Sequence, residues 1–93
     1  RGPIAVIPIG AAAEGGALTL TQTLRHDGYA VDLGFGGSLR KRMKRADKAK
    51  ARAVVLLGED ELARNAASVR DLDSGDQEVV GLDALTERLA RYR

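Results

Sequence analysis

Three short apolar segments lie in the first two thirds of the chain, and each is followed by glycine or by a basic or polar stretch. They are residues 4–9 (IAVIPI), 29–33 (YAVDL) and 53–57 (AVVLL). Segments of this length that are apolar almost throughout predict strands buried on both faces. Because Pro8 has no N–H to donate to a sheet, we expect the first strand to end near it.

Helical periodicity fills the first gap between these segments, over residues 11–27. Apolar side chains recur there every three or four residues and would form one stripe: Ala13, Ala17, Leu20 and Leu24. Gly28 follows the last of them, and a glycine can enter the left-handed conformation that closes many helices. The pattern therefore predicts one helix that ends at Gly28.

A second helix is predicted from Leu39 to about Lys50. Ser38 precedes it and is a good N-cap, because its hydroxyl can accept a hydrogen bond from a free N–H of the first turn. Leu39, Met43 and Ala46 would form its inner stripe. Almost every other position on this helix is basic.

The last third of the chain predicts a short helix, a hairpin and a final helix. Residues 59–65 allow one or two helical turns. Residues 68–72 and 77–80 alternate in polarity around an Asp-Ser-Gly-Asp turn, which predicts two antiparallel strands. Residues 83–92 follow as a helix, with an apolar face made of Leu82, Leu85, Leu89 and Tyr92.

This order of elements, β-α-β-α-β-(α)-β-β-α, predicts an α/β domain whose first three strands are parallel. Ninety-three residues suffice for one core, so residues 1–93 are expected to form a single domain. The first residue is Arg1 and not methionine, and we interpret the chain as a fragment of a longer protein. No apolar run approaches the length of a membrane span, so no membrane association is expected.

Composition removes several kinds of chemistry. The chain has no cysteine, which excludes disulfides and thiolate ligands. His26 is the single histidine and stands near a helix end without a partner that would make it a general base. We therefore predict no catalytic residue and no metal site.

The distribution of charge along the chain says more about function than the composition does. Residues 38–52 hold eight basic residues and one acidic residue, a net charge of +7. Since the whole chain carries +2, the remainder carries −5. The outward-facing cations of the predicted basic helix are Arg40, Lys41, Lys44, Arg45 and Lys48. A surface of one sign inside an acidic domain favours a polyanionic partner such as nucleic acid, although most charge runs are merely solvated.

Two further segments have both a functional and a structural interpretation. The turn over residues 34–38 (GFGGS) opens the basic helix, where backbone N–H groups can bind an anion, but it matches no phosphate-loop pattern. The acidic segment Glu59-Asp60-Glu61 follows the third strand, where α/β proteins place ligands. Acidic residues also favour the first turn of any helix.

Three stretches of the chain together resemble a known family. They are IAVIPIG, GGSLRKRMKRADKAKARAVVLLGEDELA and SVRDLDSGDQEVV. They are similar to the anticodon-binding domain shared by the His, Gly, Thr and Pro members of the class II tRNA ligases, and most of all to the C-terminal domain of bacterial histidine–tRNA ligases. The resemblance covers residues 4–89, and its most specific part joins the basic helix to the GEDELA segment.

The resemblance implies a three-layer α/β/α sandwich. Its five-stranded mixed sheet would have the order 2-1-3-4-5, with strand 4 antiparallel. It also implies cytoplasmic tRNA as partner, bound through the anticodon stem-loop, and a parent that is a homodimer. The ATP-dependent attachment of histidine would belong to a separate catalytic domain, so no cofactor is expected in this domain.

Carried over by position, the residues that the resemblance implies for anticodon reading are Gly36, Gly37, Ser38, Glu61 and Arg70. Glu61 would accept a hydrogen bond from a base edge, and Arg70 would bind or stack on an unstacked base. The basic helix would hold the RNA backbone. Many relatives have Asn-Gly before the fourth strand where this chain has Asn65-Ala66-Ala67, which affects the aim of Arg70.

Two other functions remain open on the sequence alone. A degenerate copy of such a domain would serve as a structural, dimerisation or regulatory module, because a fold does not fix a function. A small anion binder using residues 34–38 is the other, and the missing phosphate-loop pattern counts against it.

Overall fold

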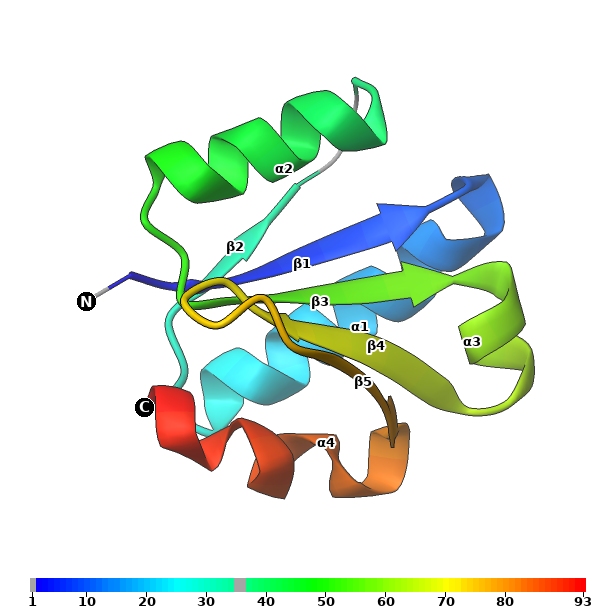
Figure 1. The fold of residues 1–93 in the computed structure, drawn as a ribbon. Helices are drawn as coiled ribbons and strands as arrows, with labels where there is room; N and C mark the ends of the chain where they lie inside the picture. Colours follow the sequence, from blue (N-terminus) through cyan, green and yellow to red (C-terminus); the bar gives the residue numbers. More distant parts are fainter. Residues whose placement is uncertain (1, 35–36) are drawn as a thin grey trace.

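A five-stranded sheet forms the centre of the molecule (Figure 1). The computed structural model describes residues 2–34 and 37–93. The strands follow the order β2-β1-β3-β4-β5, and β4 runs antiparallel to both of its neighbours. The fold class, strand order and antiparallel strand 4 are thus confirmed. The strands are β1 (Ile4–Ile9), β2 (Val31–Leu33), β3 (Ala53–Gly58), β4 (Ala66–Asp71) and β5 (Gln77–Gly81).

The connecting helices occupy the predicted segments with shifted ends. They are η1 (Ala11–Ala13), α1 (Glu14–His26), α2 (Leu39–Lys48), α3 (Glu59–Ala63), α4 (Leu82–Arg88) and η2 (Leu89–Tyr92). The first and last predicted helices are each divided between an α-helix and a 3-10 turn. The basic helix ends two residues early, because Lys50 adopts a left-handed φ of 56°.

Predicted capping residues act as expected. Gly28 has a φ of 94° and donates its N–H to the carbonyl of Arg25, while Tyr29 N–H bonds to the carbonyl of Leu24. These bonds satisfy carbonyls that the end of α1 leaves free. Ser38 Oγ accepts from the N–H of Lys41 at 3.2 Å and so caps the start of α2.

The prediction that β1 ends near Pro8 is confirmed, since β1 ends one residue later, at Ile9, and stays in register with β3 up to that point. Side-chain and backbone directions alternate along a strand. Ile4 N–H and the carbonyl of Val6 bond toward β2, so Pro8 faces the same side. Because β2 ends at Leu33, a proline there costs no ladder hydrogen bond.

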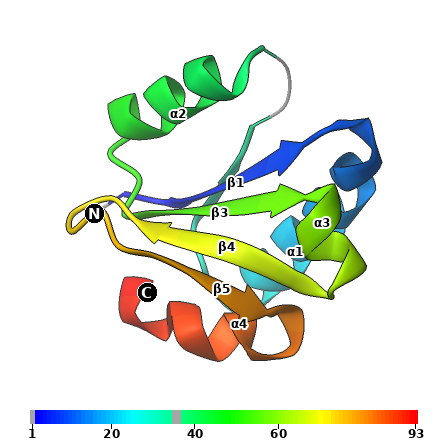
Figure 2. The same cartoon turned by 45° about the vertical axis from the view of Figure 1, so that its right-hand side comes forward.

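Two helices cover one whole face of the sheet. Side chains of β1, β3, β4 and β5 pack there against α1 and α4, as Figure 2 shows from a second side. Leu24 of α1 and Leu85 of α4 are completely buried in this layer. We call this the closed face. Its core lies between the sheet and the two helices, and it forms the larger of the two apolar clusters.

Helix α2 lies alone on the other face, above the β2–β1 side of the sheet (Figure 1). Its Ala46 packs against Ala5 and Ile7 of β1 and against Val54 of β3. The molecule is therefore a three-layer α/β/α sandwich, with two helices on one face and one on the other. We call this second face the open face, because over β4 and β5 the side chains of Arg70, Gln77 and Val79 remain exposed there, whereas Ser68 is buried.

Candidate nucleic-acid interface

The open face carries four neighbouring side chains from β4 and β5. Arg70 pairs with Gln77 across the two strands, and Ser68 pairs with Val79. Because their strand neighbours Val69 and Val80 are buried in the closed face, these four residues point to the opposite side. Val79 is 57% exposed, an unusual state for an apolar side chain in a sheet. No helix shields this half of the sheet in the described part of the chain.

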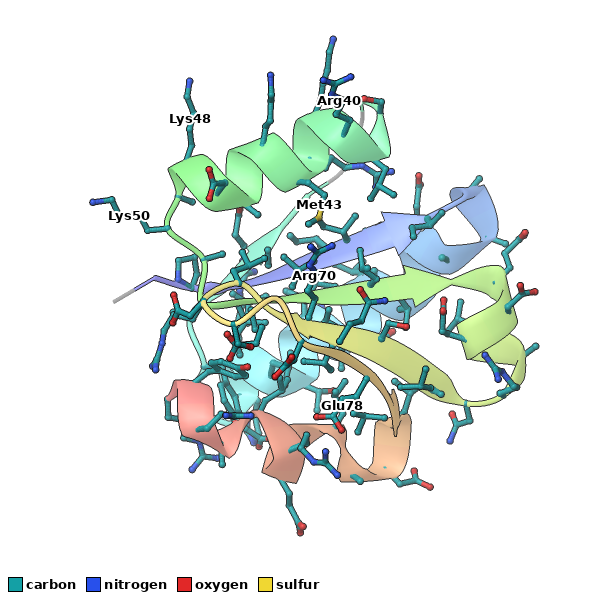
Figure 3. All side chains as sticks on the ribbon, viewed as in Figure 1. Arg40, Met43, Lys48, Lys50, Arg70 and Glu78 are labelled. Carbon is teal, nitrogen blue, oxygen red and sulfur yellow. The ribbon has the colours of Figure 1, made fainter. Side chains whose placement is uncertain are left out.

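Arg70 lies at the edge of a shallow, open groove between the sheet and α2. The groove has a volume of about 690 Å³, and its surface is mostly apolar. It is lined by Leu39, Arg40, Met43, Lys44, Asp47 and Arg70. Figure 3 shows the side chain of Arg70 rising from the sheet toward Met43 on the underside of α2. The guanidinium forms no ion pair and no hydrogen bond with any residue that the structure describes.

The groove corrects one sequence prediction. Leu39 was expected in the inner stripe of α2, but it is 41% exposed, and Met43 is only partly buried. A helical stripe shows which side chains share a side, but not how far the sheet extends beneath them. Ala46 reaches the core, whereas the first turn of α2 extends over the groove. Leu39 and Met43 are therefore groove residues that the sequence interpretation missed.

The outer surface of α2 is a dense cationic surface. Arg40 and Lys48 point away from the sheet in Figure 3. A shallow hollow of about 540 Å³ runs along the helix beside Lys41, Lys44 and Lys48. Arg45 differs from these residues, because its Nη2 lies 3.2 Å from Asp32 Oδ1 on β2. Both partners remain accessible to water, so the pair is weak and a phosphate can compete for Arg45.

The segment that precedes α2 is only partly described. Gly36, a predicted reading residue, lies outside the described residues. Gly37 has a φ of 74°, which an L side chain adopts at a cost, and it is exposed beside the capping residue Ser38. The structure therefore places Gly37 and Ser38 on the surface at the start of the cationic helix.

Glu61 has structural partners for both carboxylate oxygens. One oxygen accepts the N–H of Gly58 at 2.8 Å, and the other accepts the hydroxyl of Ser68 at 3.3 Å. A Cβ on Gly58 would lie 2.6 Å from the same carboxylate, so a larger residue there would displace the Glu61 side chain from this position. Glu61 thus joins the end of β3 to the open face of β4. A carboxylate has about four acceptor positions, so these bonds leave it able to accept another.

The hairpin that carries Arg70 is fastened to the C-terminal turn. Tyr92 Oη donates to Asp71 Oδ2 at 2.6 Å, and the guanidinium of Arg52 lies 5.5 Å from the Tyr92 ring centre. The hydrogen bond from Tyr92, followed by that from the N–H of Ser74, lowers the pKa of Asp71 to about 2. Burial and the Asp71 bond raise the pKa of Tyr92 to about 12. Asp71 is the next residue after Arg70, so this contact fixes the strand end beside the groove.

The charge of the lining residues distinguishes the groove from two other hollows of the described chain. A hollow of about 170 Å³ lies beside Asp71, Asp76 and Glu78, and these carboxylates would repel phosphate. Another, of about 340 Å³, lies between α1 and α4 and is lined by leucines, threonines and a glycine without any charge. The groove beside Arg70 differs from these two hollows, because it combines an apolar surface with a cationic border. That combination suits a single-stranded nucleic acid, whose bases are flat and weakly polar and whose backbone is anionic.

Fold and surface together describe an α/β RNA-binding module, and comparison with known proteins makes the assignment specific. A family profile described as "Anticodon binding domain" matches residues 3–92. The chain belongs to this anticodon-binding domain family. Within it, the chain corresponds to the domain found in histidine–tRNA ligases, whose sequences resemble it along nearly its whole length.

Individual relatives support this placement. The histidine–tRNA ligase of Rhodospirillum rubrum is 51% identical over 90 residues, which are 97% of this chain and 22% of that protein. The crystal structure of histidyl-tRNA synthetase from Nostoc sp. PCC 7120 superposes with a TM-score of 0.90 at 33% identity, over 98% of this chain and 22% of that one. The chain therefore spans about a fifth of the length of the relatives that it matches.

One structural neighbour shows how widely the fold is shared. The RNA-binding domain of threonyl-tRNA synthetase from Cryptosporidium parvum superposes with a TM-score of 0.88 over 97% of this chain and 23% of that one, at 18% identity. At that identity the likeness shows the fold alone. No helix in the described part of the chain is long and apolar enough to cross a membrane.

Proposed function

We propose that this domain binds the anticodon stem-loop of histidine tRNA on its open face and reads at least one unpaired base in the groove beside Arg70. The observation that carries the proposal is the unpaired Arg70 guanidinium at the edge of an apolar groove with a cationic border. A guanidinium can stack on a base and donate in-plane hydrogen bonds to it. Arg70 offers both because no described protein group occupies it.

The rest of the surface supplies what single-stranded RNA needs. Proteins of this kind combine cations that follow the backbone with flat or apolar side chains that receive the bases. Arg40, Lys41, Lys44, Arg45 and Lys48 provide the cations in this proposal. No aromatic residue lies on the groove in the described structure, so Leu39 and Met43 would provide the apolar contact. Methionine packs well against π systems because its sulfur is polarisable.

Gly36, Gly37, Ser38 and Glu61 keep supporting roles in the proposal. A glycine-containing segment at the start of a helix lets RNA approach the backbone closely. Glu61 holds the β3–α3 turn and retains acceptor capacity for a base N–H. Each of these contacts would orient the anticodon without adding positive charge.

The parent would attach histidine to the same tRNA in a separate, ATP-using domain in the cytoplasm. Two modest contacts on one tRNA, at the anticodon and at the acceptor end, raise the effective concentration of each. The domain would then contribute specificity to a reaction that takes place elsewhere on the tRNA.

Fluorescence anisotropy of the 93-residue chain with a stem-loop carrying the GUG anticodon tests the proposal. A loop with a changed anticodon and the same stem is the partner probe, and both are titrated at several salt concentrations. We expect a preference for GUG, and Arg70→Ala should weaken GUG binding by about 1–3 kcal/mol.

Arg64→Ala is the matched control, since it removes the same charge at the C-terminal end of α3, away from the groove. It should leave the preference unchanged. Equal binding of the two loops by the unaltered chain would reduce the open face to a general polyanion surface and would refute the proposal.

A further inference from the structure

One arginine of α2 points inward while its neighbours face solvent. Arg42 donates from Nη1 to the carbonyl of Pro8 at the end of β1, and its Nε is buried. Its Cδ lies 3.8 Å from the position that a Cβ on Gly34 would occupy, so the Arg42 side chain packs closely against Gly34. Arg42 is therefore turned away from the surface where the other cations would meet phosphate, and it did not appear among the residues that the sequence singled out.

The Pro8 carbonyl has a particular need for this donor. Backbone groups of β1 at Ile4 and Val6 bond toward β2, the latter through the N–H of Gly34. Pro8 lies two residues further on the same side, after β2 has ended at Leu33. The nitrogen of a proline needs no partner there, but its buried carbonyl does. Among the described residues, Arg42 is the group that donates to this carbonyl.

This contact joins three segments that border the proposed RNA site. It links α2 to the end of β1, and its side chain packs on Gly34 at the end of β2. Arg42 lies on α2 between Leu39 and Met43, the two residues that form the apolar wall of the groove. Moving the first turns of α2 would therefore move that wall relative to Arg70, which is fixed on the sheet.

We propose that Arg42 is a positioning residue for anticodon discrimination, because its bond to the Pro8 carbonyl holds the first turns of α2 at the distance from Arg70 that a base requires. The inference rests on the proposed function. It separates Arg42 from the other cations of α2: they contribute affinity to any RNA loop, whereas Arg42 contributes preference for one loop and little to the dependence on salt.

Three variants of the 93-residue chain test this assignment in the two-loop anisotropy assay. Arg42→Met keeps the aliphatic stem and removes the donor. Lys41→Met removes one exposed charge from the same helix and is the matched control. Arg42→Lys restores a donor of similar reach. Circular dichroism melts establish that each variant is folded.

The expected results differ in kind. Arg42→Met should lose about tenfold of the GUG preference, on the order of one base contact, and keep the salt slope. Lys41→Met should weaken both loops equally and reduce the salt slope by about 0.7–0.9. Arg42→Lys should recover most of the preference. If Arg42→Met behaves like Lys41→Met, Arg42 is a phosphate contact and the inference is wrong.

A measurement without RNA tests the contact between Arg42 and the Pro8 carbonyl by itself. The Gly34 amide donates to the Val6 carbonyl at 3.1 Å, which is the last bond from this side of the sheet to β1 before residues 35–36, and Gly34 lies beside Arg42. Amide hydrogen exchange at Gly34 should quicken in Arg42→Met but not in Lys41→Met or Arg42→Lys, with Val55 at the sheet centre as internal reference. Unchanged exchange in Arg42→Met overturns the inference. If the unaltered chain shows no preference between the two loops, the proposed function is wrong. Hydrogen exchange at Gly34 then still tests whether Arg42 holds α2 against the end of β1.

Discussion

The two faces of the sheet are made from the same strands but have different surroundings. On the closed face, residues of four strands pack against α1 and α4, and the layer contains fully buried Leu24, Leu57 and Leu85. On the open face, α2 covers β1 and part of β3. Small residues meet there, such as Ala5 of β1 and Ala46 of α2. Beyond it, Arg70 and Val79 remain in contact with water.

The difference shows which half of the sheet contributes little to the buried core. Covering β4 and β5 on both sides would stabilise the domain, because each Å² of buried apolar surface contributes about 25 cal/mol. The uncovered half instead presents a rigid, weakly polar surface beside a cationic helix. In the proposed function, RNA binding uses this uncovered half of the sheet, and the closed face supplies most of the buried core. The following predictions test this division.

The largest contrast should appear in stability. Leu85→Ala on the closed face should lower the free energy of unfolding by about 2–5 kcal/mol, because it leaves a cavity in a fully buried layer. Leu39→Ala on the open face should cost less than about 1 kcal/mol, since the side chain is already 41% exposed. Urea denaturation of both variants measures the difference. A Leu39→Ala variant as unstable as Leu85→Ala would place Leu39 in the core.

The introduction of a negative charge into the groove comes next. Leu39→Asp should weaken binding of the GUG stem-loop by about 1–3 kcal/mol, the range of one lost base contact, because a carboxylate at the wall repels RNA and removes the apolar surface. Leu18→Asp on α1 is the control, since Leu18 is also exposed but belongs to another helix. Anisotropy titrations compare the two. Equal effects would mean that the negative charge acts at long range and not in the groove.

A smaller effect is expected from a single exposed cation. Lys44→Ala should reduce the salt slope of RNA binding by about 0.7–0.9 and weaken all loops alike, because each neutralised phosphate of single-stranded RNA releases counterions. Arg64→Ala, outside α2, should leave the slope unchanged. A change in loop preference with Lys44→Ala would assign it to base reading instead.

The smallest effect on stability is expected from the hydrogen bond between Tyr92 and Asp71, which holds the end of the hairpin. The pKa of Asp71 is lowered to about 2 in the folded chain, below its ordinary value of 3.8. Its contribution to stability is therefore present above about pH 4 and is lost as the pH falls toward 2. Because the pKa of Tyr92 is raised to about 12 from 10.0, its contribution is present below pH 10 and is lost as the pH rises toward 12.

The variant that checks this contact is Tyr92→Phe, which keeps the ring and removes the hydroxyl. Its urea midpoint should fall less than that of the unaltered chain between pH 4 and pH 2, and also between pH 10 and pH 12. Parallel curves for the two proteins would show that the bond from Tyr92 to Asp71 does not couple to folding.

Local patterns in the sequence were enough for most of the fold. Apolar runs predicted β1 and β3 to within one residue, and the Ser38 cap and Gly28 were correct because each acts on backbone groups within a few residues. Errors arose where a distant segment decided the outcome. Leu39 shares a helical side with Ala46, yet it is 41% exposed, because the core beneath α2 does not reach its first turn. The resemblance to a family pointed to Arg70, but not to what surrounds it.

The sequence by itself determined the elements, their order, the cationic helix and the family, since periodicity, capping and charge are properties of neighbouring residues. Only the tertiary structure decided which half of the sheet stays open, that Leu39 and Met43 line a groove, and that Arg42 turns inward. These outcomes depend on how far α2 extends across the sheet and where β2 ends. Such distances are set by packing between segments far apart in the chain, and no local pattern records them.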